Sequence, residues 1–184
     1  MRVVAFNGSP RRDGNTATLI RRVFAGLEQK GIETELVQLA DKRIHGCIAC
    51  EGCAVSRNRR CAVADDDANE CIEKMLGAEG IILGSPVYFQ DVTSEMKALI
   101  DRCGYVSRSN GRMFSRRVGA SVVAVRRSGG IRTLDTMDHF FLSGEMVIVG
   151  RAFAIGRAKG EAKKDLEGMQ LAVSRGQRMA WVLK

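Results

Sequence analysis

The sequence has few aromatic residues, few histidines and no long apolar run, and each shortage excludes a class of function. Aromatic residues make up 5% of the 184 positions, and no stacking platform such as an RNA-recognition motif is visible. The longest apolar runs are a few residues, far below the roughly 20 that a membrane-spanning helix needs. The 2 histidines, His45 and His139, have no partner serine or cysteine in a hydrolase context, so we expect them at the surface.

The start of the chain and its charge bear on location and partners. No basic segment followed by an apolar core stands after Met1, so no secretory signal is expected and we place the chain in the cytoplasm. The net charge is +8, but the basic residues are spread along the chain rather than clustered. We therefore expect a solvated surface that attracts anionic ligands such as nucleotides, with no nucleic acid and no membrane as partner.

Strand-like and helix-like segments alternate along the chain, which has the length of a single domain, 1–184. The apolar runs that predict strands lie at 2–7, 34–39, 80–86, 118–125 and 145–150. Helical spacing of apolar residues predicts helices at about 15–31, 65–78, 92–103, 131–143 and 161–183. Five βα units predict an α/β fold with a doubly wound, five-stranded parallel sheet, in which ligands bind outside the carboxyl ends of the strands.

The loop after the first strand, GSPRRDGNTAT (8–18), has the chemistry of a phosphate site. It offers hydroxyls, a side-chain amide and two arginines, and it runs into a helix N-terminus, whose backbone N–H groups bind phosphate. A Walker A motif is absent, because Asn15 stands where that motif has lysine, and G-x-G-x-x-G is absent as well. The pattern favours a phosphomonoester held without magnesium; a polar loop with a helix cap is the alternative.

Two further loops end at the same predicted edge of the sheet. In GSPVYFQDVTSEMKALIDR (84–102), the residues Val87, Tyr88 and Phe89 bring apolar surface and backbone N–H groups directly after the third strand. A flat ring could pack there, and the alternative is that the two aromatic residues cap the core. In RRSGGIRT (126–133), two glycines allow close backbone approach to a ligand, and a flexible turn is the alternative.

Together the three loops resemble the flavodoxin-like family of NAD(P)H-dependent FMN reductases, over essentially the whole chain. The resemblance implies that the first loop holds the FMN phosphate through Ser9, Arg11, Asn15 and Thr16. It implies that the ring of the flavin is held by Pro86, Val87, Tyr88 and Phe89 and flanked by Ser128, Gly129 and Gly130. It also implies a flavodoxin-like strand order and assembly as homodimers or homotetramers.

Four of the 6 cysteines lie in the segment GCIACEGCAVSRNRRC (46–61), within a turn-rich stretch of about 43–64 after the second strand. A C-x2-C-x2-C run is typical of the loop that wraps one corner of an iron–sulfur cluster, and the intervening residues let a fourth cysteine fold back to it. The pattern resembles the iron–sulfur flavoprotein branch of the family, which implies a [4Fe–4S] cluster held by Cys47, Cys50, Cys53 and Cys61. An interface loop with free thiols, a zinc site and a disulfide are the alternatives.

Other polar residues near this segment have simpler interpretations. Arg57, Arg59 and Arg60 are expected near the cluster, where they would offset its negative charge. Asp65, Asp66 and Asp67 are expected to begin a helix rather than to bind magnesium. Cys71 and Cys103 fall in predicted helices, so we expect them to be buried structural thiols.

The resemblance implies an enzyme with no catalytic side chain, because the flavin carries the chemistry. FMN would take two electrons from NAD(P)H, and the cluster would pass single electrons to or from a ferredoxin-like carrier. A reductase of FMN, quinone or nitro compounds without a cluster, and a flavin-binding redox sensor, are the alternatives. In known iron–sulfur flavoproteins the cluster lies near the flavin of a neighbouring subunit, so the hypothesis implies an oligomer.

Overall fold

The computed structural model describes residues 1–184 and contains one sheet of five parallel strands. The strands are β1 (Arg2–Asn7), β2 (Glu33–Gln38), β3 (Gly80–Pro86), β4 (Val118–Val125) and β5 (Val147–Ile155), and their order is β2-β1-β3-β4-β5. The helices are α1 (Asn15–Glu28), α2 (Gly52–Ser56), α3 (Ala68–Leu76), α4 (Ser94–Ser109), α5 (Gly130–Ser143) and α6 (Leu166–Leu183). Two short 3₁₀ turns, Leu39–Asp41 and Glu161–Lys164, precede the cysteine segment and α6.

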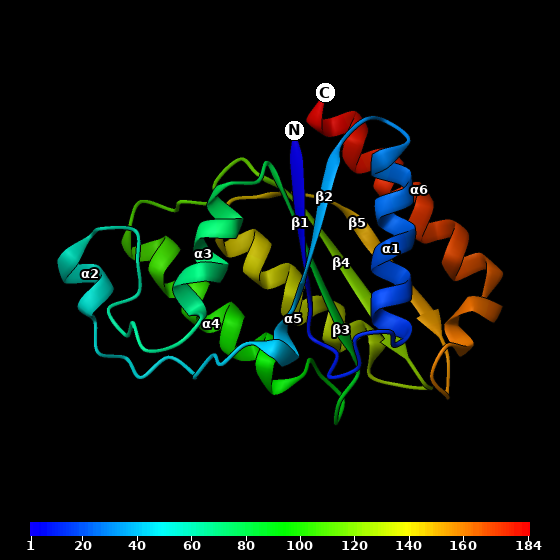
Figure 1. Cartoon of the computed structure of the whole chain (residues 1–184), viewed down its shortest axis with the longest axis horizontal. Coiled ribbons are helices and arrows are strands. Elements are labelled where there is room, and N and C mark those ends of the chain that lie inside the picture. The colour runs from blue at the N-terminus through cyan, green and yellow to red at the C-terminus, as the bar shows by residue number, and fades with distance from the viewer.

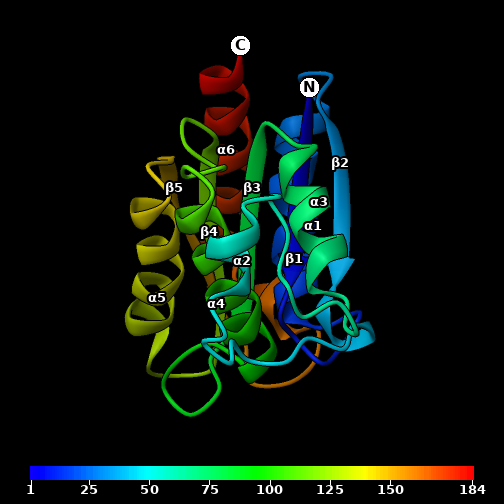
Figure 2. The ribbon, with the colours of Figure 1, turned by 90° about the vertical axis from the view of Figure 1, so that its left-hand side faces the viewer.

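The helices cover both faces of the sheet, as the doubly wound prediction requires. In β1, Val4 and Phe6 face the layer of α3, α4 and α5, whereas Val3 and Ala5 face α1 and α6. Figure 2 shows the sheet between these layers, with α2 and α3 in front of it and α1 behind. Because all four side chains are fully buried, β1 reads as a continuous apolar run rather than an alternating one.

The layer of α1 and α6 depends on two glycines. A Cβ added to Gly26 would lie 2.3 Å from the carbonyl oxygen of Val173, and one added to Gly176 would lie 2.0 Å from that of Val23. Neither position has room for a side chain, so the two helices approach at their backbones. This contact joins the two ends of the fold, because α6 follows the last strand and packs against the first helix, α1 (Figure 1).

The expected strands and helices are present, and the main differences concern the ends of three elements and the cysteine segment. Helix α4 continues to Ser109, beyond its predicted end at about 103. Strand β5 continues to Ile155 instead of ending at Gly150, and its pairing with β4 shifts register between Gly119 and Ala120. The last helix begins at Leu166, because Asp165 accepts a hydrogen bond from the Gly168 N–H and caps it there. The cysteine segment contains the short helix α2, which no apolar period announced.

The carboxyl ends of the strands lie at one edge, opposite the two termini (Figure 1). The loops after β1, β3, β4 and β5 therefore meet at that edge. The cysteine segment begins at the same edge, after β2, and then passes over α3 and α4 to the far end of the molecule from α6. None of the helices has both the length and the apolarity that crossing a membrane requires.

Candidate functional site

The loop after β1 is held in place by its neighbours at the sheet edge. The Asn7 side chain accepts a hydrogen bond from the Ser9 N–H at 3.1 Å, and the Ser9 hydroxyl accepts one from the Arg11 N–H at 3.2 Å. The Thr93 hydroxyl donates to the Gly8 carbonyl at 2.9 Å, which ties this loop to the start of α4. A Cβ on Gly8 would lie 2.9 Å from that hydroxyl, so the close approach needs glycine.

Thr16 has an unpaired hydroxyl at the start of α1. The residue is 1% exposed, and its Oγ1 has no hydrogen-bond partner. The first turn of α1 also carries backbone N–H groups without intrahelical partners and contains no acidic residue. A buried hydroxyl without a partner costs about 1–3 kcal/mol, and a ligand bound at this helix start would supply the missing partner. An anion such as a phosphate fits this combination.

Asn15 and the two arginines of the loop make different contacts. The Asn15 side chain donates to the Ala158 carbonyl at 2.9 Å and accepts from the Ala162 N–H at 3.2 Å, so it fastens α1 to the segment after β5. Arg12 forms an ion pair with Asp41, whereas Arg11 has no ion-pair partner. Arg11 is therefore the arginine of this loop that is available to an anion.

The loop after β3 turns sharply and presents an aromatic side chain. Tyr88 and Asp91 pair through both backbone hydrogen bonds, at 2.9 and 3.2 Å. Between them, Phe89 has φ 47° and Gln90 has φ 74°, values that non-glycine residues rarely adopt. Phe89 is fully exposed and Tyr88 is 49% exposed, so neither caps the core. Strained backbone and exposed aromatic surface at one turn are typical of a ligand-binding loop.

Asp91 holds this turn against α5, and sequence reasoning did not single it out. Its carboxylate accepts hydrogen bonds from Thr136 Oγ1 at 2.7 Å, from the backbone N–H of the next residue, Val92, at 2.8 Å and from Arg132 Nε at 3.1 Å. Burial alone would raise the pKa of Asp91, but these donors hold it below its ordinary value. The only sequence signal was its place four residues after Val87, in the predicted ring-binding motif.

The loop after β4 lies against the aromatic turn. Gly129 has φ 83°, and a Cβ there would lie 2.7 Å from Val87 Cγ1. The Ser128 hydroxyl accepts a hydrogen bond from Gln90 Nε2 at 3.3 Å. The two loops are thus in direct contact at the edge of the sheet where the sequence pattern predicted both of them to end.

Most of the predicted residues surround connected pockets at this edge. One pocket is lined by seven of them, Ser9, Arg11, Asn15, Thr16, Pro86, Val87 and Tyr88. An adjoining pocket shares Val87 and Arg126 with the first and adds Phe89 and Ser128. Gly129 and Gly130 line a third hollow, beside Phe153 and Ile155 of β5.

Sequence reasoning missed the contribution of the segment after β5. Gly156 and Arg157 line the first pocket together with Arg126 from the loop after β4. Arg11, Arg126 and Arg157 therefore face the pocket from three loops, and no acidic residue lines it. The sequence does contain a glycine–arginine pair, Gly156 and Arg157, directly after β5. Because the predicted strand ended at residue 150, this pair was not expected at the edge of the sheet.

The four clustered cysteines line a second, separate hollow. Cys47, Cys50, Cys53 and Cys61 share it with apolar residues, with Tyr105 and with Arg102. Cys47 and Cys50 are exposed, whereas Cys53 and Cys61 are buried, and all four thiols are free. No residue lines both this hollow and the pockets of the sheet edge.

The side chains of Asn69 in α3 and of Asn110, the residue that follows α4, hold the two buried cysteines. Asn69 accepts from the Cys61 N–H at 2.8 Å and donates to the Cys61 carbonyl at 3.1 Å. Asn110 donates to the Cys53 carbonyl at 3.2 Å and accepts from the Arg59 N–H at 2.8 Å. The backbone of the cysteine segment thus obtains its partners from neighbouring helices rather than from a regular element of its own.

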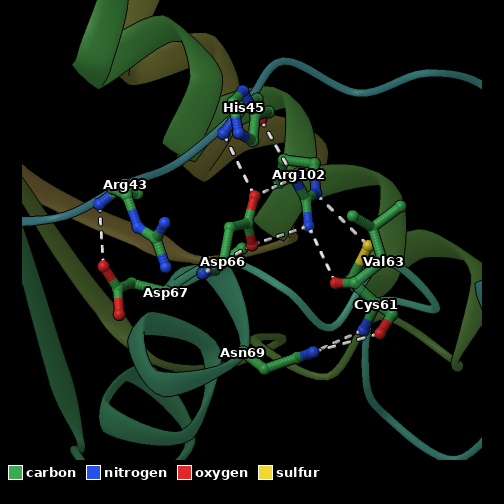
Figure 3. A network of polar contacts seen from close by, with 9 residues as sticks. Arg43, His45, Cys61, Val63, Asp66, Asp67, Asn69 and Arg102 are labelled. Carbon is green, nitrogen blue, oxygen red and sulfur yellow. Dashed lines mark hydrogen bonds and ion pairs between the residues drawn. The ribbon is translucent and has the colours of Figure 1, made fainter.

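Arg102 and Asp66 form a buried ion pair beside Cys61 (Figure 3). Their side chains are 2% and 0% exposed, and Nη1 of Arg102 lies 2.6 Å from Oδ2 of Asp66. Burial by itself would raise the pKa of Asp66, but the guanidinium and two backbone N–H groups lower it below its ordinary value. Asp66 is therefore a charged partner of α4, whereas the sequence predicted only a helix start; Asp67 does precede α3.

The structure adds an arginine to those that the sequence placed near the cysteines, and the Arg57 N–H does donate to the Cys53 carbonyl at 3.2 Å. Arg102, from a different element, is the arginine that lines the cysteine hollow, and Arg57, Arg59 and Arg60 do not line it. Arg60 instead pairs with Glu73 at the surface. The local spacing of the arginines could not reveal this, because α4 is brought to the segment only by the fold.

The backbone between the cysteines is strained. Ala49 has φ 52° and Glu51 has φ 57°, so residues on both sides of Cys50 adopt the left-handed region. Gly52 permits the turn to contact the end of the segment, since a Cβ there would lie 2.5 Å from Ala62 Cβ. The four thiols around one hollow supply the kind of donor set that iron–sulfur clusters use.

The geometry differs from that of a single metal ion. No group of three or more His, Cys, Asp or Glu side chains is arranged to bind one ion. Thiolates that share one tetrahedral zinc lie about 3.8 Å apart, given Zn–S bonds of about 2.3 Å. A cubane cluster binds each thiolate at a different corner, so its ligands need not converge on one point.

The other singled-out residues lie where the sequence predicted. Cys71 and Cys103 are fully buried in the core, and burial raises the pKa of the Cys71 thiol to about 12. His45 and His139 are exposed. None of the four lines a pocket of either region.

Comparison with known proteins places these features in a family. A family model described as NADPH-dependent FMN reductase matches residues 1–160. An iron–sulfur flavoprotein of Methanocaldococcus jannaschii is 37% identical over 193 aligned residues, covering 100% of this chain and 98% of that protein. An iron–sulfur flavoprotein of Methanosarcina thermophila is 30% identical over 187 residues, covering 100% and 96%.

Solved structures of low identity show the fold. An NAD(P)H:quinone oxidoreductase from Methanothermobacter marburgensis has a TM-score of 0.74 at 14% identity, with 96% of each chain covered. A flavodoxin from the domain Archaea has a TM-score of 0.64 at 14% identity, with 100% of each chain covered. The flavodoxin-like fold predicted from the sequence is therefore confirmed.

Proposed function

Because this chain belongs to the NADPH-dependent FMN reductase family and is an oxidoreductase, we propose that it transfers electrons between a reduced nicotinamide nucleotide and a one-electron carrier, by means of FMN and a [4Fe–4S] cluster. The observation that carries this proposal is that four cysteines of one segment line one hollow. Full-length similarity to iron–sulfur flavoproteins supports it.

The sheet-edge pocket is the proposed FMN site. The Thr16 hydroxyl, the free N–H groups of α1 and the Arg11 guanidinium would bind the phosphate. Val87 and Tyr88 would contact the ring from the turn that Asp91 holds. Arg126 and Arg157 add positive charge at the same pocket, which favours anionic ligands, the phosphates of a nicotinamide nucleotide among them.

The cysteine hollow is the proposed cluster site, with Cys47, Cys50, Cys53 and Cys61 as ligands. Bound FMN supplies hydride acceptance in two-electron units, and a bound cluster supplies one-electron transfer. The residues of the chain hold the two groups, exclude water from Cys53 and Cys61 and set the charge around them. No acid–base side chain is required.

The two proposed sites are separated within one chain, and this supports an oligomer. Helix α4 begins at the sheet edge, where Thr93 contacts Gly8, and reaches the cysteines at Arg102. Nine residues of helix correspond to about 13.5 Å along the axis. We therefore propose a homodimer or homotetramer in which the cluster of one chain lies near the flavin of another, working in the cytoplasm with a ferredoxin-like partner.

Anaerobic purification followed by a visible spectrum tests the proposal. We expect flavin bands with a broad brown absorption, and iron and acid-labile sulfide near four each per chain. Flavin without iron, even after reconstitution, would contradict the cluster. Absence of FMN uptake would contradict the assignment of the sheet-edge pocket.

A family reductase without a cluster is the second candidate. The specific observation in its favour is that two of the four cysteines are exposed. Such an enzyme would reduce flavin, quinone or nitro compounds with NAD(P)H and contain no iron. A flavin-binding redox sensor would bind FMN but show no sustained NAD(P)H oxidation with an added acceptor.

A further inference from the structure

Arg102 is the most thoroughly held side chain near the cysteines. Its Nε donates to Cys61 Sγ at 3.2 Å, and its Nη1 donates to Asp66 at 2.6 Å and to the His45 carbonyl at 3.0 Å. Its Nη2 donates to Asp66 at 3.1 Å and to the Val63 carbonyl at 3.2 Å. All three nitrogens are engaged, so the guanidinium has one orientation, with its Nε–H directed at the sulfur (Figure 3).

The arrangement requires arginine and not merely a positive charge. A guanidinium offers five N–H donors in a rigid planar fork, whereas a lysine ammonium is a compact point charge on a flexible stem. Asp66 occupies two of the nitrogens and thereby aims the third. Asp66 is itself held by the His45 N–H at 3.1 Å and the Ala68 N–H at 3.1 Å, so the aiming residue is also fixed.

Cys61 differs from the other three cysteines of the hollow in this contact. It is 9% exposed, and its sulfur accepts a hydrogen bond from a buried charged group. Cys47 and Cys50 are exposed to water. The four corners of a bound cluster would therefore lie in unequal surroundings, with the Nε–H of a buried, ion-paired arginine at one of them.

We propose that Arg102 is a positioning residue of the cysteine site, which holds the Cys61 sulfur in place and raises the reduction potential of a cluster bound there. A cluster that has accepted an electron carries more negative charge, so a hydrogen bond from the Arg102 Nε–H to a ligand sulfur stabilises the reduced form, while Asp66 balances the charge of the guanidinium. The inference rests on the proposed function, since it concerns the tuning of that cluster.

The test compares variants that keep the charges of the buried pair balanced. Removing Arg102 alone would leave Asp66 buried and unpaired, so the main variant is the double substitution Asp66→Asn, Arg102→Gln. Arg102→Lys keeps a positive charge but loses the aimed Nε–H. Arg60→Gln is the matched control, because Arg60 lies in the cysteine segment, pairs with Glu73 at the surface and does not line the hollow.

Each chain is reconstituted anaerobically with iron and sulfide, and the potentials of the cluster and of FMN are measured by redox titration of the same sample. We expect a lower cluster potential in the double variant, a smaller decrease in Arg102→Lys and no change in Arg60→Gln. The FMN potentials serve as an internal reference and should stay constant. A merely structural role of Arg102 would not shift one potential alone.

An iron-loaded double variant with an unchanged cluster potential would overturn this inference and leave the proposed function intact. If the double variant binds no iron, the test rests on Arg102→Lys. An unchanged cluster potential in that variant would likewise overturn the inference. A wild-type chain that takes up no iron would overturn the proposed function, and the inference with it.

Discussion

The sheet edge and the cysteine segment are both loops after parallel strands, but they are ordered in different ways. The loops of the sheet edge are short, and strand ends and helix starts fix them, as Ser9 and Thr16 illustrate. The cysteine segment is long, contains little regular structure and depends on side chains of α3, of α4 and of the residue that follows α4, chiefly Asn69, Arg102 and Asn110. The order of the strands and helices therefore fixes the sheet-edge loops, whereas side-chain contacts from distant helices fix the cysteine segment.

The two regions also differ in how completely their binding groups are placed. At the sheet edge, Thr16 is buried and unpaired, and the pocket is open and basic. In the cysteine segment, Cys53 and Cys61 are buried and held, whereas Cys47 and Cys50 are exposed. The comparison indicates that the fold encloses the Thr16 hydroxyl at the sheet edge, whereas it encloses only two of the four clustered cysteines.

The largest expected effect is a loss of iron at the cysteine segment without a loss of flavin at the sheet edge. Cys50→Ser should remove bound iron while FMN remains, because a hydroxyl is a poor substitute for a thiolate ligand and the sheet edge shares no lining residue with this hollow. Iron, sulfide and flavin are counted per chain. Cys71→Ser, at a thiol of the core, should keep the iron; if Cys50→Ser keeps it as well, the ligand set is wrong.

Loss of the buried charge should destabilise the fold through the cysteine region. Asp66→Asn leaves the buried Arg102 without its counter-ion, for which we expect a loss of about 3–5 kcal/mol in the free energy of unfolding. Urea denaturation of the iron-free protein measures it. The control is Asp65→Asn, at an exposed neighbour, and equal effects in the two variants would refute the role given to the buried pair.

A smaller effect is expected at the sheet edge. Thr16→Val keeps the shape of the side chain but removes the hydroxyl that we assign to the phosphate. A hydrogen bond to a charged group contributes about 1.5–3 kcal/mol, so the Kd for FMN should rise about 10- to 150-fold. Flavin fluorescence titration measures the Kd.

Thr18→Val is the matched control for this prediction. Thr18 lies in the same helix, but its hydroxyl donates to the Gly14 carbonyl at 3.1 Å and does not line the pocket. An unchanged Kd in Thr16→Val, or an equal rise in both variants, would remove the phosphate assignment.

The smallest expected effect concerns Asp91, whose folded pKa lies below its ordinary value of 3.8. A depressed carboxyl pKa contributes stability that is fully present above the unfolded pKa and is lost as the pH falls through the folded one. Asp91→Asn should therefore lower the Tm slightly at pH 7, by the equivalent of about 1 kcal/mol or less, since Asp91 is partly exposed.

The difference in Tm between wild type and Asp91→Asn should shrink below a pH of about 4. Thermal unfolding at several pH values measures it. A difference that does not depend on pH would show that the contacts of Asp91, rather than its charge, hold the aromatic turn.

Motifs along the chain predicted most of the fold and the sheet-edge site. Buried parallel strands have continuous apolar runs, so β1, β3 and β4 were predicted at their observed bounds. The family resemblance of the loops at 8–18 and 84–102 is confirmed by the family match. Arg157 was missed because β5 continues beyond Gly150, and an extension that follows from register with β4 leaves little trace in local spacing.

By itself, the sequence determined the alternation of strands and helices, the family, and which cysteines are clustered in one segment. These properties depend on local periodicity and on spacing within single segments. Only the tertiary structure decided that Arg102 and Asp66 lie beside Cys61, that Asn15 fastens the segment after β5 and that Thr16 has no partner. The physical reason is that burial and pairing depend on which distant segments meet: Arg102 lies 41 residues from Cys61, and packing of α4 against the cysteine segment brings them together.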